Sequence, residues 1–518
     1  MKTKIGQLFV VGFPGREMTP ELKQLIHDYK IGGVILFAYN IGTPKEVLAL
    51  TTALQKEAKA AGYKYPLLIA IDEENGTVKR LGEGAGEYPG AMALSATEDS
   101  KYAYEVGKAT GSDLLNLGIN WNYAPVLDVN NNPNNPVISV RSFGETPEMV
   151  SEFGIEFMKG LQSSKVATAL KHFPGHGDTN VDSHYALPII NHDMERLEEI
   201  ELVPFKHAIL EGADSIMTAH IVFPALEPEA GRPATLSKNI ITGLLREKLG
   251  FDGVIVTDAL EMDAIAESIG IPNGSVEALK AGVDNVLIGH LPDEQLKALK
   301  RVEEAVNNGE ISADRIKESY ARVNKLKEKY LSWDDLNFDS LEVSETFNSK
   351  EKQQLAKRAY EESVTVLKTG VPLTREMNLL VLQPKDELRT IAEDVTEDNF
   401  TLTQTIKKYV ANVEVEMVTN SLTEEEKQNI LEKSKKADRI LLGTMVVKED
   451  DDIILLVKEL SKEKTVDLIS MKSPYVGKFL KGANYWINTY EPSRMPIDIA
   501  VRTLLEEIKP TGVSPVTI

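Results

Sequence analysis

The sequence predicts an α/β protein of two domains, an N-terminal (β/α)8 barrel of the TIM type followed by a C-terminal α/β sandwich with a layered, mostly parallel sheet. Three observations support this fold class. A chain of 518 residues is too long for one ordinary hydrophobic core. Residues 1–330 alternate short apolar segments with longer amphipathic ones. The same alternation resumes after a polar stretch at 331–349.

Eight apolar segments are expected to form the barrel strands. They lie near Gln7–Phe13, Gly33–Phe37, Leu67–Ile71, Ile119–Val126, Ala167–His172, Ser215–Ala219, Gly253–Thr257 and Asn285–Ile288. The segments between them have helical spacing, as in Pro44–Ala60 and Asp193–Glu211. Strands that alternate with helices pair in parallel through right-handed crossovers, and eight such units close into a barrel. Its active site is expected at the carboxyl ends of the strands.

A long amphipathic segment, Ala313–Tyr330, closes the first domain, and residues 331–349 are predicted to be a linker. The second domain is expected to span residues 350–518, beginning with a helix at Lys350–Glu362. Its strands are expected near Ser363–Leu367, Asn378–Leu382, Val413–Val418, Arg439–Thr444, Val466–Ser470 and Tyr485–Asn488. The last histidine of the chain is His290, so any histidine chemistry belongs to the first domain.

The composition argues against several classes of function. A formal net charge of −21 opposes binding to nucleic acid, whose phosphates need a basic surface. The absence of cysteine removes disulfides, thiolate metal sites and cysteine nucleophiles. No segment approaches the ~18 consecutive apolar residues of a membrane span, and the N-terminus predicts a first strand rather than a signal peptide. We expect a cytoplasmic protein, although a secreted chain already trimmed of its signal would look the same.

A dense cluster of titratable residues follows the fifth predicted strand. Within residues 171–184 lie three of the eight histidines and two aspartates, His172, His176, Asp178, Asp182 and His184. In an extended segment, Asp182 and His184 project to the same side. A carboxylate beside an imidazole fixes its tautomer, and the pair can then exchange protons near neutral pH. The alternative is a surface loop with chance histidines.

Zinc is a second alternative for this cluster, with His172, His176, Asp178 and His184 as ligands. The spacing of His172 and His176 suits a metal only on a helix. Pro174 within this segment disfavours a helix. We therefore expect no metal and no cofactor.

Asp258 directly follows the seventh predicted strand, a run of buried β-branched residues. At that position it is a candidate nucleophile, metal ligand or N-cap of a helix that runs through Ala264. Four more polar residues lie near strand ends or in the loops that follow, namely Asp72, Arg80, Arg141 and Lys171. Fixed charges at a barrel mouth suit a polyhydroxylated ligand, while the alternative is a set of structural ion pairs.

The motifs together resemble glycoside hydrolase family 3, in its NagZ-type β-N-acetylglucosaminidase branch and in the two-domain form. The resemblance rests on six motifs in the same order along the first domain. They are Ala124–Asp128, Arg141–Gly144, Lys171–Thr179 with Asp182–His184, Met217–His220, Pro233–Ser237 and Leu249–Leu260. The second domain is similar to the family's sandwich domain through shorter segments near residues 363, 473 and 488.

This resemblance implies roles for eight residues. Asp258 matches the nucleophile that forms a covalent glycosyl-enzyme, His184 matches the acid/base, and Asp182 is the carboxylate that orients it. The remaining five match positions around the non-reducing-end GlcNAc, namely Asp72, Arg80, Arg141, Lys171 and His172. Retaining glycosidases usually use two carboxylates, and in this branch a His–Asp pair replaces one of them.

The resemblance implies a retaining exo-β-N-acetylglucosaminidase that acts on muropeptides in peptidoglycan turnover and cell wall recycling. We expect a monomer with no nucleic-acid or membrane partner. The alternatives are a phosphorylase or β-glucosidase of the same family, a non-catalytic sugar-binding protein and a zinc hydrolase. One motif departs from the family pattern Asp-Gln-Glu-Gly-Gly, because residues 72–76 contain Glu73 and Asn75 in place of glutamine and glycine. Asn75 tolerates a positive φ, so the turn is expected to survive.

Overall fold

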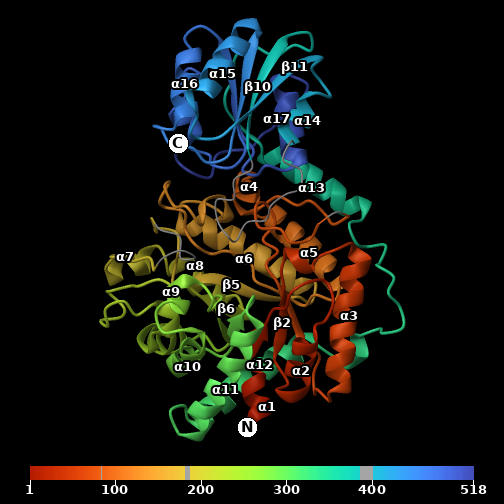
Figure 1. Cartoon of the computed structure of the whole chain (residues 1–518), viewed down its shortest axis with the longest axis vertical. Helices are drawn as coiled ribbons and strands as arrows, with labels where there is room; N and C mark the ends of the chain where they lie inside the picture. Colours follow the sequence, from red (N-terminus) through yellow and green to blue (C-terminus); the bar gives the residue numbers. More distant parts are fainter. Residues whose placement is uncertain (83, 181–186, 386–400) are drawn as a thin grey trace.

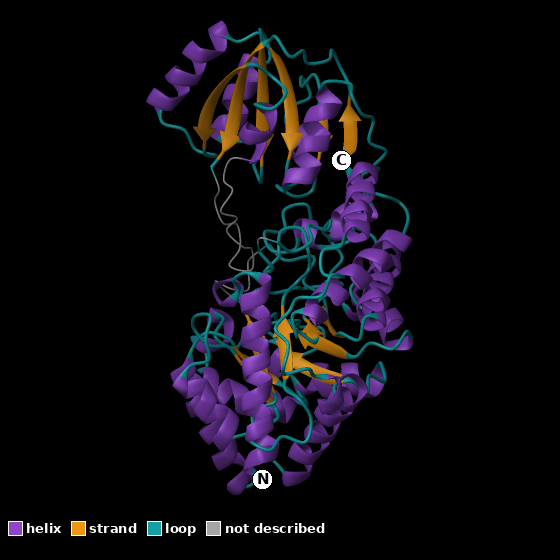
Figure 2. Ribbon diagram, turned by 90° about the vertical axis from the view of Figure 1, so that its right-hand side faces the viewer, coloured by secondary structure: helices purple, strands orange, loops and turns teal. Residues whose placement is uncertain are grey.

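The computed structural model describes the chain except for residues 83, 181–186 and 386–400. Two domains are stacked along the long axis of the molecule (Figure 1). The N-terminus lies at the end of the first domain that is remote from the second (Figures 1 and 2). Within the described residues, no helix is both long and apolar enough to cross a membrane.

The first domain is the expected parallel barrel. Its strands are β1 (Phe9–Val11), β2 (Gly33–Leu36), β3 (Leu68–Ile71), β4 (Trp121–Asn122), β5 (Ala167–Phe173), β6 (Ser215–Thr218), β7 (Val254–Thr257) and β8 (Val286–Ile288). Their order is β7-β6-β5-β4-β3-β2-β1-β8, with every adjacent pair parallel. A parallel bridge between Val256 and Asn285 connects the two outer strands. The barrel prediction is therefore confirmed.

Two strands, β1 and β4, are several residues shorter than predicted, for identifiable reasons. The segment before β1 forms the short helix α1 (Lys2–Gly6), so the first strand begins at Phe9. The segment expected at Ile119–Val126 pairs regularly only over β4, because Pro125 has no N–H to donate to a ladder. Pairing resumes in an isolated bridge from Val126 to Lys171.

Helices surround the barrel strands. The longer ones are α2 (Pro20–Asp28), α3 (Pro44–Ala60), α5 (Lys101–Asn116), α6 (Pro147–Ser163), α7 (Met194–Glu199), α8 (Val203–Leu210), the π-helical η4 (Asn239–Lys248), α10 (Ile271–Ala281), α11 (Pro292–Asn307) and α12 (Ala313–Tyr330). Short turns are α4 (Ala91–Ser95), α9 (Asp263–Ala266), η1 (Ala38–Asn40), η2 (Ser139–Arg141) and η3 (Ala234–Leu236). A threonine N-cap followed by proline starts α2, α3 and α6.

One predicted helix is divided. The segment Asp193–Glu211 forms α7 and α8 rather than a single helix. Pro204 lies in the first turn of α8, where its missing N–H costs nothing, whereas in the interior of a continuous helix it would remove a hydrogen bond.

After the short helix η5 (Trp333–Asp335), the second domain begins with α13 (Lys350–Ser363). Its sheet contains β9 (Thr365–Lys368), β10 (Asn378–Pro384), β11 (Asn412–Val418), β12 (Arg439–Thr444), β13 (Thr465–Ser470) and β14 (Trp486–Asn488), in the order β11-β10-β12-β13-β14-β9. Only β9 is antiparallel to its neighbour among these described strands. The other helices are α14 (Thr401–Ile406), α15 (Glu424–Lys436), α16 (Asp452–Leu460), η6 (Val476–Lys478) and α17 (Arg494–Leu504), and α15 and α16 lie apart from α14 and α17 across the sheet (Figure 1). This layered sheet confirms the predicted sandwich.

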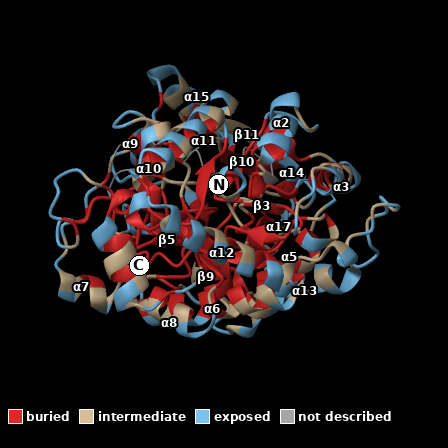
Figure 3. Cartoon of the chain, turned by 90° about the horizontal axis from the view of Figure 1, so that it is seen from below, coloured by how far each residue is buried: buried red, intermediate tan, exposed pale blue. Residues whose placement is uncertain are grey.

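The hydrophobic core fills the barrel. Buried residues occupy its centre and exposed ones its outer rim (Figure 3). Trp121 and Tyr123 are both fully buried, with their rings edge to face at 4.9 Å. The same core continues into the second domain, where Val381 and Ile487 of the sheet belong to it.

Glycines set the distance between α5 and α6. An added Cβ at Gly107 would lie 2.4 Å from the carbonyl oxygen of Phe157, and one at Gly160 would lie 2.2 Å from that of Tyr104. The two helices therefore pack backbone against backbone, and this contact leaves no room for a side chain.

We predict that Gly107→Ala lowers the free energy of unfolding by about 1–3 kcal/mol, because the helices must separate. The matched control is Gly243→Ala in η4, where nothing lies closer than 4.0 Å to the new methyl group. That change is expected to be neutral or stabilising by up to about 1 kcal/mol. Denaturant unfolding of both variants checks the prediction, and equal effects would contradict it.

Candidate active site

The charged residues predicted at the barrel mouth gather at the carboxyl ends of the strands. Asp72 directly follows β3, Lys171 and His172 are near the end of β5, and Asp258 follows β7. The second domain packs against this same end, since loops that follow β3 and β4 contact it. The site is therefore formed where the two domains meet.

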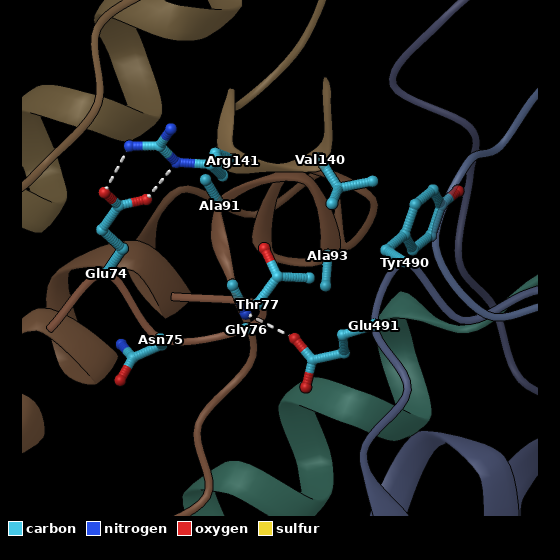
Figure 4. A pocket seen from close by; sticks show the side chains of 11 residues that line it. Glu74, Asn75, Gly76, Thr77, Ala91, Ala93, Val140, Arg141, Tyr490 and Glu491 are labelled. Carbon is cyan, nitrogen blue, oxygen red and sulfur yellow. Dashed lines mark hydrogen bonds and ion pairs between the residues drawn. The ribbon is translucent and has the colours of Figure 1, made fainter. Parts of the chain in front are cut away.

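Lys171 is the centre of a buried ionic cluster. Its Nζ lies 2.6 Å from Asp72 Oδ1 and 2.6 Å from Glu74 Oε1. Arg141 donates two hydrogen bonds to Glu74, from Nε at 2.9 Å and from Nη2 at 2.8 Å (Figure 4). Burial raises the pKa of Glu74, but the charges of Arg141 and Lys171 outweigh it and hold that pKa far below its usual range. Two cations thus balance two carboxylates.

Glu74 was not predicted as a site residue, although it lies in the segment 72–76 that carries Asp72. Its position in the sequence gave no sign of its partners, since Arg141 is 67 residues away. The ion pairs are buried, with the side chains of Lys171, Arg141 and Glu74 at most 6% exposed. Asp72 is the most open member at 16% exposure, which leaves its carboxylate accessible to a ligand.

Asp128 holds the histidine segment that follows β5. Its Oδ2 lies 2.7 Å from His172 Nδ1, and its Oδ1 accepts the backbone N–H groups of His172 and His176 at 3.2 and 2.7 Å. Burial opposes the ionised form, but the charge of His172 lowers the pKa of Asp128. With Nδ1 donating to this carboxylate, His172 keeps Nε2 for another partner.

The described histidines of this segment have different hydrogen-bond partners. His172 pairs with Asp128, His176 Nδ1 lies 3.0 Å from Thr179 Oγ1, and Asp178 pairs with His192 at 2.6 Å. Burial lowers the pKa of His176 to about 4, so its ring is neutral. No group of three or more histidine, aspartate or glutamate side chains within the described residues is placed to hold a metal ion. Asp182 and His184 lie outside the described residues.

The departure at residues 73–75 is accommodated inside the loop. Glu73 is buried, and its Oε2 accepts the backbone N–H groups of Arg80 and Leu81 at 2.9 Å each. Asn75 adopts φ +64°, and its side chain donates to Thr110 Oγ1 at 3.1 Å. Glu73 therefore shapes the turn that carries Arg80, and the expectation that asparagine preserves this turn is confirmed.

Asp258 does not cap a helix. Its Oδ1 accepts the N–H of Ala259 at 2.8 Å, and α9 begins only at Asp263 with Met262 as its N-cap. The N-cap alternative is therefore wrong, because a turn separates Asp258 from the helix. Burial, with the charges of Asp72 and Asp258 adding to it, raises the pKa of Tyr123 well above its ordinary value.

A second carboxyl group, Glu261, lies near Asp258. Its Oε1 accepts the backbone N–H groups of Gly289 at 2.5 Å and His290 at 2.7 Å. Burial, with the charge of Asp258 adding to it, raises the pKa of Glu261 to about 7. Sequence reasoning missed this residue because its burial depends on the packing of the loop after β7 against the end of β8.

Comparisons with known proteins agree with this geometry. The model of the glycosyl hydrolase family 3 N-terminal domain matches residues 1–326. Beta-hexosaminidase A of Pseudoalteromonas piscicida is 42% identical over 333 residues, which cover 60% of this chain and 56% of that relative, so the match spans little more than half of its length. A beta-hexosaminidase of Alkalilimnicola ehrlichii is 35% identical over 290 residues, which cover 55% of this chain and 81% of that protein.

A solved structure is similar over both domains. It is a glycoside hydrolase family 3 beta-N-acetylglucosaminidase from Paenibacillus sp. str. FPU-7, with a TM-score of 0.94 and 38% sequence identity. The similarity covers 100% of this chain and 98% of that one. Since the family model matches well over half of the chain and a structure of the same family superposes on all of it, the protein belongs to glycoside hydrolase family 3.

Proposed function

We propose that this protein is a retaining exo-β-N-acetylglucosaminidase that releases terminal non-reducing β-GlcNAc from peptidoglycan fragments. The observation that carries the proposal is the placement of the Asp258 carboxylate at the same barrel end as the Lys171–Asp72–Glu74–Arg141 cluster. Such a cluster offers both donors and acceptors, which a sugar ring with several hydroxyl groups requires. The β-N-acetylglucosaminidase activity of the similar Paenibacillus protein supports the choice of sugar.

In the proposed reaction, Asp258 attacks the anomeric carbon and the bond to the leaving-group oxygen breaks. His184, oriented by Asp182, gives its proton to that oxygen, so the aglycone leaves as an alcohol. His184 then takes a proton from water, whose oxygen attacks the anomeric carbon and releases Asp258. Two inversions give net retention of configuration.

Asp72 accepts hydrogen bonds from sugar hydroxyls, while Lys171, Arg141 and Arg80 donate to the sugar and His172 offers Nε2. Glu261 serves the nucleophile indirectly. Burial raises the pKa of Glu261 to about 7, so a substantial fraction of this group is neutral near neutral pH, which lowers the negative charge close to Asp258.

A neutral imidazole base also keeps negative charge away from the acceptor side of the site. This property suits the carboxylate-bearing aglycone of a muropeptide, GlcNAc–MurNAc or GlcNAc–anhydroMurNAc. We propose that the enzyme is a monomer and that it acts in cell wall recycling in the cytoplasm.

The first test is hydrolysis of p-nitrophenyl β-GlcNAc and p-nitrophenyl β-glucoside, each with and without phosphate. We expect GlcNAc-selective release that does not need phosphate, and a loss on the order of 10⁴-fold or more in Asp258→Ala. Release that requires phosphate would assign the protein to the phosphorylases, and preference for glucoside would assign it to the β-glucosidases.

The acid role of His184 predicts a dependence on the leaving group. In His184→Ala, aryl glycosides with poor leaving groups should lose about 10²–10⁴-fold in kcat/KM, because they need a proton from the enzyme. A dinitrophenyl glycoside needs none and should lose much less in its first step. A Brønsted plot of kcat/KM against the pKa of the leaving group measures this, and equal losses across the series would argue against the role.

Glu261 predicts a pH dependence of stability. Its folded-state pKa of about 7 lies above the ordinary value of 4.5, so the folded protein binds more protons than the unfolded chain between these values. The stability contributed by the neutral form is fully present below pH 4.5 and is lost as the pH rises through 7, by about 3 kcal/mol. Glu261→Gln keeps the oxygen that accepts both backbone N–H groups but does not titrate. The variant should therefore gain stability relative to the wild type from pH 5 to pH 8, and a constant difference would refute the assignment.

A further inference from the structure

We propose that Glu491 and Tyr475 of the second domain are positioning residues for the sugar-binding cluster of the barrel. They hold the loops after β3 and β4, which carry Asp72, Glu74, Asp128 and Arg141, without contacting the sugar. The inference rests on the proposed function for the identity of the ligand. It assigns a role to the second domain.

Glu491 is a buried carboxylate at the interface between the two domains. It is 2% exposed, and its Oε2 accepts the backbone N–H of Gly90 in the barrel at 2.9 Å. Its Oε1 accepts hydrogen bonds from the hydroxyl groups of Tyr360 and, at 2.7 Å, Ser493, both outside the barrel. A buried carboxylate is costly unless donors surround it. The second domain thus supplies two donors that fix this group, and the group in turn fixes Gly90.

Gly90 is packed against the turn that carries Glu74. A Cβ added at Gly76 would lie 2.9 Å from the Cα of Gly90 and 3.1 Å from Oε2 of Glu491. Gly76 has φ +61°, so this turn also needs glycine for its backbone conformation. Figure 4 shows Glu491 directed at this turn, with the Glu74–Arg141 pair on the other side of it. A shift of Gly90 would therefore displace the backbone two residues from Glu74.

The cavity beside Glu491 is too small to hold a sugar. It measures about 10 Å³ and is lined by Glu74, Thr77, Arg141, Tyr490 and Glu491 among others. That volume is at the lower limit for one water molecule. Glu491 therefore acts on a ligand only through the loop that it holds.

Tyr475 makes an equivalent contact with the loop after β4. Its hydroxyl oxygen accepts a hydrogen bond from Asn130 Nδ2 at 3.1 Å, and this pair is buried. Asn130 lies two residues after Asp128, which fixes His172 and His176. Both loops thus receive a buried hydrogen bond from the second domain.

Apolar packing extends the same contact to Arg141. A small cluster joins Met92, Ala93, Ala96 and Val140 of the barrel to Tyr475, Tyr490 and Val516. Val140 precedes Arg141 in the short helix η2. Three segments that carry the cluster are therefore held from one surface of the second domain, and misplacement by about 1 Å is enough to impair an enzyme about 10²-fold.

The test compares four single variants of the full chain, Glu491→Ala, Glu491→Gln, Tyr475→Phe and Tyr102→Phe. Tyr102→Phe is the matched control. The hydroxyl of Tyr102 in α5 donates to Glu362 of α13 at 2.6 Å, so this variant loses a hydrogen bond between the domains that lies away from these loops. Two measurements are made on each variant. The first is hydrogen–deuterium exchange of peptides that cover residues 72–90 and 128–144, and the second is steady-state hydrolysis of p-nitrophenyl β-GlcNAc.

We expect Glu491→Ala to speed exchange in residues 72–90 and to raise KM about tenfold with a smaller change in kcat. A displaced sugar-binding loop weakens binding of the substrate and of the transition state equally, and such a loss raises KM more than it lowers kcat. Tyr475→Phe should speed exchange in residues 128–144 and raise KM about threefold. Glu491→Gln keeps an acceptor for Gly90 and should stay within about twofold of the wild type. Tyr102→Phe should change neither loop nor KM.

Unchanged exchange and KM in Glu491→Ala and Tyr475→Phe, or equal changes in Tyr102→Phe, would overturn the proposal. If Glu491→Ala does not fold, the isosteric Tyr475→Phe decides. A wild type that releases no GlcNAc would refute the proposed function, while the exchange measurement would still test whether these residues hold the loops.

Discussion

The ionic cluster around Lys171 is the constraint on which the site depends. Its ammonium group lies between Asp72 and Glu74, and Arg141 clamps Glu74 from the other side. Removing any member would leave a buried charge without its counter-charge, which costs far more than the intact cluster contributes. The surrounding structure therefore has to keep four residues from three loops or strands in register. The buried Glu73, the positive-φ turn at Asn75 and the contacts of the second domain all serve that requirement.

Charge balance also explains how one barrel end can hold so many ionised groups. The cluster has two positive and two negative members, while Asp128 is paired with His172 and surrounded by backbone N–H groups. Burial raises the pKa of Glu261 to about 7, so much of this group carries no charge below that pH. Asp258 follows β7 at the same end of the barrel, where its Oδ1 accepts the N–H of Ala259.

The sequence predicted which residues lie at the ends of strands, but not which residues they form hydrogen bonds and ion pairs with. Asp72, Lys171 and Asp258 could be placed at one end of the barrel because the alternation of strands and helices sets the direction of every strand. The partners could not be deduced, because Asp128 and His172 are 44 residues apart and Gly90 and Glu491 are 401 apart. Local signals also misled at Pro125 and Pro204, where proline interrupted a ladder and divided a helix. Asp258 had the local pattern of a helix cap, and only the turn before α9 excludes it.

The continuous core described above makes the second domain more than an appendage. Val381 and Ile487 belong to the same apolar cluster as the barrel interior, whereas the opposite face of the sheet has a core of its own around Leu380 and Leu442. On the face of the sheet that bears Val381 and Ile487, the cluster also includes Leu402 of α14 and Leu504 of α17, so helices of the second domain cover this face. Cutting the chain at the linker would instead remove the packing through which this cluster continues from the barrel into the second domain. The two halves are expected to melt in a single cooperative step, so the whole chain, rather than either domain, is the unit that folds.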